Sequence, residues 1–164
     1  MIIPSEMWNP GIPVPLRYTQ FNKPTLRVGL QGVQVLELRK LLNNWGVTVA
    51  CCNDQFDLEL EKAVRQFQRR FFLKEDGAVG AATWQALYTG SPVNMPVLRR
   101  GSDEPAVRLL QRALIVTKDY CGEIDGEFGE MTELAVCSFQ KRYGLVIDGI
   151  VGACSWRALS KAVD

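Results

Sequence analysis

The stretch 135–156 reads AVCSFQKRYGLVIDGIVGACSW, and it repeats the stretch 63–84, AVRQFQRRFFLKEDGAVGAATW, at an offset of 72 residues. The correspondence extends outward without a gap until it joins residues 26–87 to residues 98–159, and 22 of these 62 aligned pairs are identical. A fixed period of this kind indicates two copies of one structural unit. The function should therefore be sought in that unit.

The hydrophobic pattern predicts three helices in each copy. Apolar residues lie three and four positions apart in the first helix and at i, i+4 and i+8 in the second, and a shorter third helix follows a glycine. In the second copy these positions are Val107, Leu110 and Leu114, then Ala135, Phe139 and Tyr143, then Trp156 and Leu159. No alternating strand pattern competes with them. The expected fold class is therefore all-α, with two tandem three-helix bundle repeats.

Prolines and glycines mark the domain boundaries. The expected organisation is an extended, Pro-rich N-terminal arm at 1–25, a first repeat at 26–88, a linker at 89–97 and a second repeat at 98–164. Five prolines in the arm argue against a helix or a central strand there. We expect its aromatic residues Trp8, Tyr18 and Phe21 to dock onto either the repeats or a partner protein.

The composition excludes several classes of function. The 19 basic and 18 acidic side chains give a net charge of +1, without the basic excess typical of nucleic-acid binding. No apolar run approaches the roughly 18 residues that span a bilayer. The N-terminal sequence MIIPSEMWNPGIPVP lacks the pattern of a secretory signal peptide, so the chain is expected to have lost its signal, to leave the cytosol by another route or to stay inside.

The residue types also argue against catalysis and against a metal or cofactor. The chain has no histidine, which removes histidine-ligated zinc and histidine-activated nucleophiles. The acidic residues between Glu123 and Glu133 are expected to form a solvated loop rather than a glycosidase pair. Five cysteines form no CxxC pair, and the pairing of Cys137 with Cys154 is left open. The sequence therefore predicts a protein that is not an enzyme.

The motifs resemble those of the peptidoglycan-binding domain type 1 family. In the second copy they read VRLLQ at 107–111, DGEFG at 125–129, TELAVCSFQ at 132–140 and DGIVGACSW at 148–156. The first copy retains the later motifs but has NDQFD at 53–57 in place of the first Asp-Gly loop. The resemblance implies a three-helix wall-binding module, with binding carried mainly by the second copy.

Most of the shared residues have a structural explanation. We expect Phe67, Phe139, Trp84 and Trp156 to lie in the core, and Gln68 and Gln140 to tie a loop to a helix. Loops carry polar recognition groups more readily than a packed helix face does. The candidate ligand-binding residues are therefore Asp125, Gly126, Asp148 and Gly149, with Tyr143, Arg142 and Arg99 nearby to contact glycan hydroxyls or peptide carboxylates.

Two functions follow as hypotheses. The first is a non-catalytic protein that binds peptidoglycan, through its glycan strand or stem peptide, in the cell envelope or periplasm. The alternative is a structural component of an envelope-associated or phage-tail-like assembly that has repurposed the fold and contacts a protein partner through the arm. The absence of a signal pattern and the divergent loop of the first copy favour the alternative.

Overall fold

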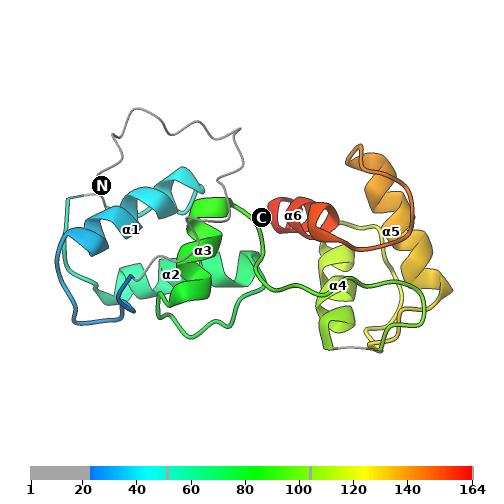
Figure 1. Cartoon of the computed structure of the whole chain (residues 1–164), viewed down its shortest axis with the longest axis horizontal. Coiled ribbons are helices and arrows are strands. Elements are labelled where there is room, and N and C mark those ends of the chain that lie inside the picture. Colours follow the sequence, from blue (N-terminus) through cyan, green and yellow to red (C-terminus); the bar gives the residue numbers. More distant parts are fainter. Residues whose placement is uncertain (1–22, 51, 104, 164) are drawn as a thin grey trace.

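The computed structural model describes residues 23–50, 52–103 and 105–163. These residues form six helices, three in each repeat (Figure 1). The helices are α1 (Val33–Asn44), α2 (Leu58–Arg70), α3 (Ala81–Thr89), α4 (Pro105–Val116), α5 (Glu130–Arg142) and α6 (Ala153–Ala162). The described residues contain no strand, only three isolated antiparallel bridges. The all-α fold of two tandem three-helix repeats is confirmed, whereas Trp8, Tyr18 and Phe21 of the predicted arm lie outside the described residues.

Local sequence explains where several helices begin and end. The carboxylate of Asp57 caps α2 by accepting a 2.8 Å hydrogen bond from the amide of Leu60. Pro105 opens α4, where the missing amide hydrogen leaves no helical bond unmade. Gly90 ends α3 in the left-handed conformation, with φ of 61°.

Each repeat has its own hydrophobic core, and a tryptophan of the third helix is buried in each. Trp84 and Trp156 are both 1% exposed. The indole of Trp84 donates to the carbonyl of Pro24 at 3.2 Å, and that of Trp156 donates to the carbonyl of Pro96 at 2.8 Å. These bonds fix the chain where it enters each repeat. The predicted core positions, Phe67 and Phe139 included, are confirmed.

The two repeats lie side by side along the long axis of the molecule and touch at the end of α2 (Figure 1). The ring of Phe72 meets the ring of Trp156 edge to face, with centroids 5.3 Å apart. The guanidinium of Arg70 donates to the carbonyl of Ser160 at 3.1 Å and to that of Trp45 at 2.7 Å. The end of α2 thereby joins the first core to the second.

Cys52, Cys121, Cys137 and Cys154 are free thiols. Cys137 and Cys154 therefore do not form a disulfide pair. Among the described residues no helix combines the length and the apolar composition that crossing a membrane requires.

Candidate functional site

The Asp-Gly turn before α6 is held by a buried glutamine of α5. The amide nitrogen of Gln140 donates to Asp148 Oδ1 at 2.8 Å and to the carbonyl of Ile150 at 2.9 Å. Its amide oxygen accepts from the backbone N–H of Gly149 at 3.0 Å. Gly149 has φ of +70°, and a Cβ atom there would lie 3.2 Å from Glu133 Cγ, so the turn requires glycine.

The same arrangement closes the loop before α5. Gln111 of α4 donates to Asp125 Oδ1 at 2.7 Å and to the carbonyl of Glu127 at 3.1 Å. It accepts from the backbone N–H of Gly126 at 3.0 Å and also contacts the hydroxyl of Thr132 at 3.2 Å. Gln111 is fully buried, so all of its polar capacity is used inside the protein.

A third copy of this arrangement lies in the first repeat. Gln68 of α2 donates to Asp76 Oδ1 and to the carbonyl of Ala78, both at 2.9 Å, and accepts from Gly77 at 2.9 Å. The expectation that Gln68 and Gln140 tie a loop to a helix is therefore confirmed. These glutamines are therefore structural residues, whose polar groups bond within the protein.

The loop before α2 is the fourth equivalent loop, and it is the one that departs from the motif. The residue that holds it is an arginine in place of a glutamine. Arg39 aligns with Gln111 and is only 2% exposed. Its guanidinium donates to the carboxylate of Asp57 at 2.8 Å, to the carbonyl of Gln55 at 2.8 Å and to that of Ala50 at 3.0 Å. An ion pair between the buried Arg39 and the partly exposed Asp57 therefore replaces the Gln–Asp–Gly arrangement. The divergent loop is ordered by different chemistry rather than lost.

Each Asp-Gly turn of the second repeat exposes a carboxylate that stays charged. The amide of Gln111 and then the backbone N–H of Glu127 lower the pKa of Asp125 below its usual 3.8. The backbone N–H of Ile150 and then Gln140 lower the pKa of Asp148 in the same way. Both sets of bonds fall on Oδ1, so Oδ2 of each exposed aspartate can accept a hydrogen bond from a sugar hydroxyl or an amide.

Two further candidate residues lie together where α5 ends. Tyr143 stacks on Phe139 with centroids 4.4 Å apart and remains 43% exposed. The guanidinium carbon of Arg142 is 5.2 Å from the Tyr143 ring, and its Nη2 donates to Asp119 at 2.5 Å and to the carbonyl of Thr117 at 2.8 Å. An exposed aromatic face beside a guanidinium can contact both an apolar sugar face and a carboxylate.

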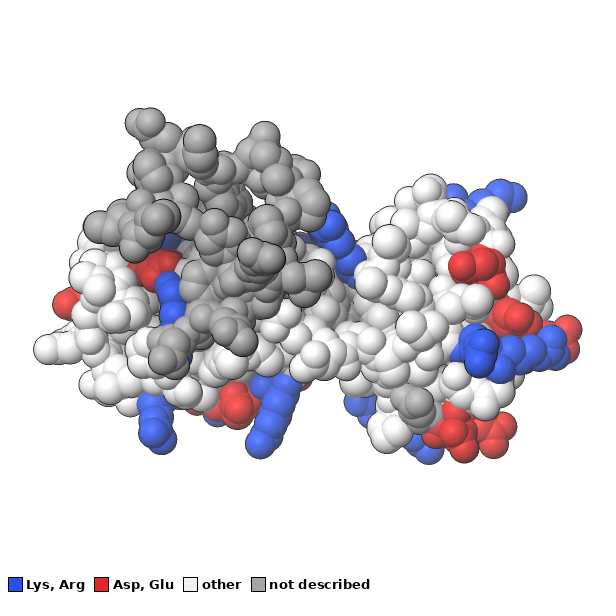
Figure 2. All heavy atoms as spheres, in the orientation of Figure 1, with Lys and Arg blue, Asp and Glu red and all other residues white. Residues whose placement is uncertain are grey.

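The seven predicted residues come from four separate segments of the second repeat. Backbone bonds join the segment that holds Arg99 to the residues after the two turns, from Leu98 to Val151 and from Gly101 to Phe128. Asp125 and Gly126 pack against α4, where a Cβ atom on Gly126 would lie 2.9 Å from the side chain of Arg108. Asp148 and Gly149 pack against α5, the helix that Arg142 and Tyr143 end. Arg99 is exposed on the segment before α4. On the face shown in Figure 2, basic and acidic side chains lie intermixed over the second repeat.

The sequence analysis missed a hollow of about 600 Å³ in the first repeat. It lies between residues 28–31, which precede α1, and residues 55–59, at the start of α2. Val28, Leu30 and Leu58 are 43%, 42% and 64% exposed, and the lining also includes the carboxylates of Asp57 and Glu59. The signal in the sequence was the departure at NDQFD, whose last three residues, 55–57, line the hollow.

Comparison with known proteins identifies the repeats. The family described as "Putative peptidoglycan binding domain" matches residues 31–87 and residues 103–159. The N-acetylmuramoyl-L-alanine amidase CwlM of Mycobacterium tuberculosis is 35% identical over 151 residues, which is 82% of this chain and 37% of that protein. No solved structure matches the chain.

Two other relatives match a shorter part of the chain. A spore cortex-lytic enzyme of Bacillus cereus is 39% identical over 66 residues, or 40% of this chain and 26% of that protein. The zinc D-Ala-D-Ala carboxypeptidase of Streptomyces albus G is 40% identical over 72 residues, or 41% of this chain and 27% of that protein. The chain therefore spans little more than a third of the length of the longest-matching relative and about a quarter of the other two.

Proposed function

Because the chain belongs to the peptidoglycan-binding domain family, we propose that it binds bacterial peptidoglycan, mainly through its second repeat, and catalyses no reaction on it. The observation that carries the proposal is the tandem family match over residues 31–87 and 103–159. Three of the four equivalent loop positions also keep the closed Asp-Gly turn, and the fourth is closed by the Arg39–Asp57 pair. Both repeats therefore present ordered loops.

The contacts proposed for the wall lie on the second repeat. Asp125 and Asp148 present a charged oxygen that accepts from glycan hydroxyls. Tyr143 presents its ring beside Arg142, whose Nη2 already bonds to Asp119, and Arg99 presents a guanidinium group suited to stem-peptide carboxylates. Because these residues come from separate turns and segments of the repeat, they suit an extended polymer that covers a broad surface.

The absence of catalysis is the second half of the proposal. The chain has no histidine, and the described residues hold no group of three or more His, Cys, Asp or Glu side chains arranged to bind a metal ion. The relatives described above are named as enzymes, and this chain matches a minor part of each. We therefore propose that this chain has the wall-binding role of such a protein and acts at the cell wall.

The relatives favour wall binding over the alternative of a repurposed assembly component. Their names refer to N-acetylmuramoyl-L-alanine, spore cortex and D-Ala-D-Ala, all of which are wall chemistry. A protein partner at residues 1–25 stays part of the proposal, because wall binding by the repeats does not exclude it.

The test is co-sedimentation of the purified chain with washed peptidoglycan sacculi. Asp148→Asn keeps an oxygen that can accept from Gln140 and Ile150 but removes the charge, so it should fold normally and pellet less. Asp76→Asn makes the same change in the first repeat and is the matched control. If the parent chain pellets no better than an unrelated protein, the proposed function is wrong, and release of soluble muropeptides would contradict the non-catalytic assignment.

A further inference from the structure

A second hollow, of about 510 Å³, lies where the two repeats meet. One wall is formed by the end of α2 and the loop that follows it, including Arg69, Phe72 and Lys74. The opposite wall is formed by α4, including Leu109, Arg112 and Val116. Its volume lies within the range of ~300–1,000 Å³ typical of small-ligand sites. We refer to it as the inter-repeat groove.

The inter-repeat groove exposes apolar side chains that the fold leaves uncovered. Leu109 is 36% exposed and Val116 is 54% exposed, although both lie on a helix whose other face is fully buried. Phe72 closes the groove at the contact with Trp156. An occupant with small apolar groups would cover these side chains and gain from their burial.

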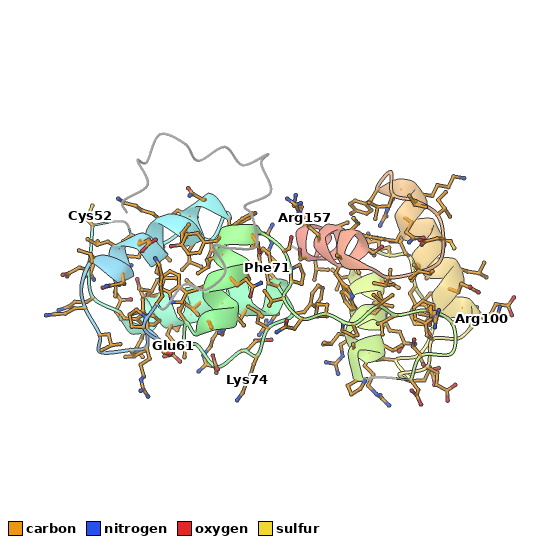
Figure 3. All side chains as sticks on the ribbon, viewed as in Figure 1. Cys52, Glu61, Phe71, Lys74, Arg100 and Arg157 are labelled. Carbon is orange, nitrogen blue, oxygen red and sulfur yellow. The ribbon has the colours of Figure 1, made fainter. Side chains whose placement is uncertain are left out.

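The charged residues of the groove determine which ligand charge it favours. Arg69 is neutralised by Glu75, which it contacts at 2.8 Å and whose pKa it lowers. Among the described residues, Lys74 and Arg112 make no ion pair, and they lie on opposite walls. Figure 3 shows Lys74 extending from the edge of the first repeat. The groove therefore offers two cations to a ligand with carboxylates.

Neither repeat can form this groove alone. At the offset of 72 residues, Lys74 corresponds to Val146, so the second repeat lacks that cation. Likewise the α4 residues Leu109, Arg112 and Val116 correspond to Glu37, Lys40 and Asn44 of α1, which are all polar. The combination of apolar and cationic walls exists because the second repeat packs against the end of α2. It is a property of the tandem arrangement.

We propose that the inter-repeat groove binds the stem peptide of peptidoglycan, which combines alanine methyl groups with free carboxylates. The proposal rests on the proposed function and adds to it the part of the wall that is recognised there. Lys74 and Arg112 hold carboxylates from the two walls, and Leu109 and Val116 cover the methyl groups between them. A neutral glycan strand has no group that would engage both cations.

The test is calorimetric titration of the full chain with a free stem peptide, L-Ala-γ-D-Glu-L-Lys-D-Ala, at low salt. Arg112→Ala removes one charge-assisted contact and should weaken binding about tenfold. Lys40→Ala makes a similar change at the corresponding position of α1 and should leave binding unchanged. Lys74→Ala should weaken binding as Arg112→Ala does, with Lys62→Ala of α2 as its control. All four side chains are exposed, so these variants should fold normally.

The ligand series separates the groove from the proposed function. The peptide with its carboxylates amidated, and a chitin oligosaccharide as the glycan probe, should bind at least tenfold more weakly than the free stem peptide. Failure of the stem peptide to bind, or equal binding by the parent chain and Arg112→Ala, would overturn the groove assignment even if the chain pellets with sacculi. Failure to pellet while the stem peptide still binds as described would instead count against wall binding by the intact chain.

Discussion

The guanidinium of Arg39 donates to the carboxylate of Asp57 at 2.8 Å, at the position where the second repeat has Gln111. In the second repeat Gln111 closes its loop through Asp125. In the first repeat Arg39 reaches the same backbone position, since the carbonyl of Gln55 aligns with that of Glu127. Two different polar pairs therefore hold the same loop in the two repeats.

Replacing Arg39 tests this exchange. Arg39→Gln removes the charged donor to the Asp57 carboxylate, which keeps its bonds from Leu60 and Asn53, and the donor to two backbone carbonyls. We expect a loss of about 2 kcal/mol in the free energy of unfolding. Lys40→Gln, on the exposed side of α1, should change it by less than about 0.5 kcal/mol. Urea unfolding followed by tryptophan fluorescence measures both variants.

A rescue experiment makes the same test specific. Adding Asn53→Asp, Asp54→Gly and Leu60→Thr to Arg39→Gln copies the polar set of the second repeat. We expect this combination to recover at least half of the lost stability, because the glutamine then regains a carboxylate, a glycine amide and a hydroxyl as partners. Unchanged stability in Arg39→Gln would show that the ion pair does not hold the loop.

The buried glutamines should be costly to remove. Gln140→Ala leaves the amides of Asp148 and Gly149 without their acceptor and removes one of the two donors to the carbonyl of Ile150, and we expect a loss of about 2 kcal/mol. Gln66→Ala, at an exposed position of α2, is the control. Hydrogen exchange at Gly149 should accelerate in Gln140→Ala, and an unaltered exchange rate there would contradict the assigned role.

The sequence predicted the fold because the same hydrophobic pattern occurs twice, once in each repeat. The three-helix order, the buried tryptophans and the role of Gln140 all followed from the 72-residue offset. The role of Arg39 did not follow, because an isolated arginine in a helix pattern normally indicates a solvated face. Its partner Asp57 is 18 positions away, and nothing in the spacing joins them.

The candidate site was harder to predict than the fold. Sequence placed Asp125 and Asp148 in exposed turns, which the structure shows, but it did not indicate that the first turn is held by α4 and the second by α5. The inter-repeat groove was out of reach, because it depends on how Phe72 seats one repeat against the other. Packing between two units is set by surface shape, and a repeat pattern within each unit does not encode it.

Gly90 should tolerate no side chain. Its φ of +61° is unfavourable for other residues, and a Cβ atom would lie 2.1 Å from the Trp45 ring, whose indole donates to the carbonyl of Leu87 at 2.8 Å. We expect Gly90→Ala to lose about 3 kcal/mol. Gly129→Ala is the control, because no atom lies within 4 Å of its Cβ position, and thermal unfolding should differ clearly between the two.

Acid should weaken the fold through the turn aspartates. The folded-state pKa values of Asp125 and Asp148 are lowered, by the hydrogen bonds from Gln111 and from the Ile150 amide respectively. A lowered folded-state pKa stabilises the fold above the unfolded-state value near 3.8, and this stability is lost as the pH falls through the folded-state pKa. The thermal midpoint of unfolding should therefore decrease as the pH is lowered below about 4.

The double variant Asp125→Asn, Asp148→Asn checks the origin of that pH dependence. It cannot titrate at either turn, so its midpoint should fall less steeply between about pH 5 and pH 2 than that of the parent chain. Parallel curves for the two proteins would mean that other carboxylates cause the acid sensitivity. Asp57 and Asp76, whose pKa values are also lowered, would then be the next to test.

Phe72 should couple the unfolding of the two repeats. It is half-buried, packs against the second core and meets the Trp156 ring at 5.3 Å, although it belongs to the first repeat. Each repeat alone is small and buries little apolar surface. Phe72→Ala should therefore lose about 2 kcal/mol and separate one urea transition into two, because it removes an aromatic contact between the cores.

The conservative variant distinguishes coupling from a general loss of stability. Phe72→Leu keeps an apolar side chain against Trp156 and should retain a single transition. Phe72→Gly reproduces Gly144, the residue at the corresponding position, and relieves a backbone φ of 56° that disfavours phenylalanine. If Phe72→Gly still shows two transitions, the stability lost with the ring contact exceeds the stability gained by relieving the backbone strain. The aromatic side chain would then be what joins the repeats. One transition in all three variants would show that Arg70 and the linker suffice.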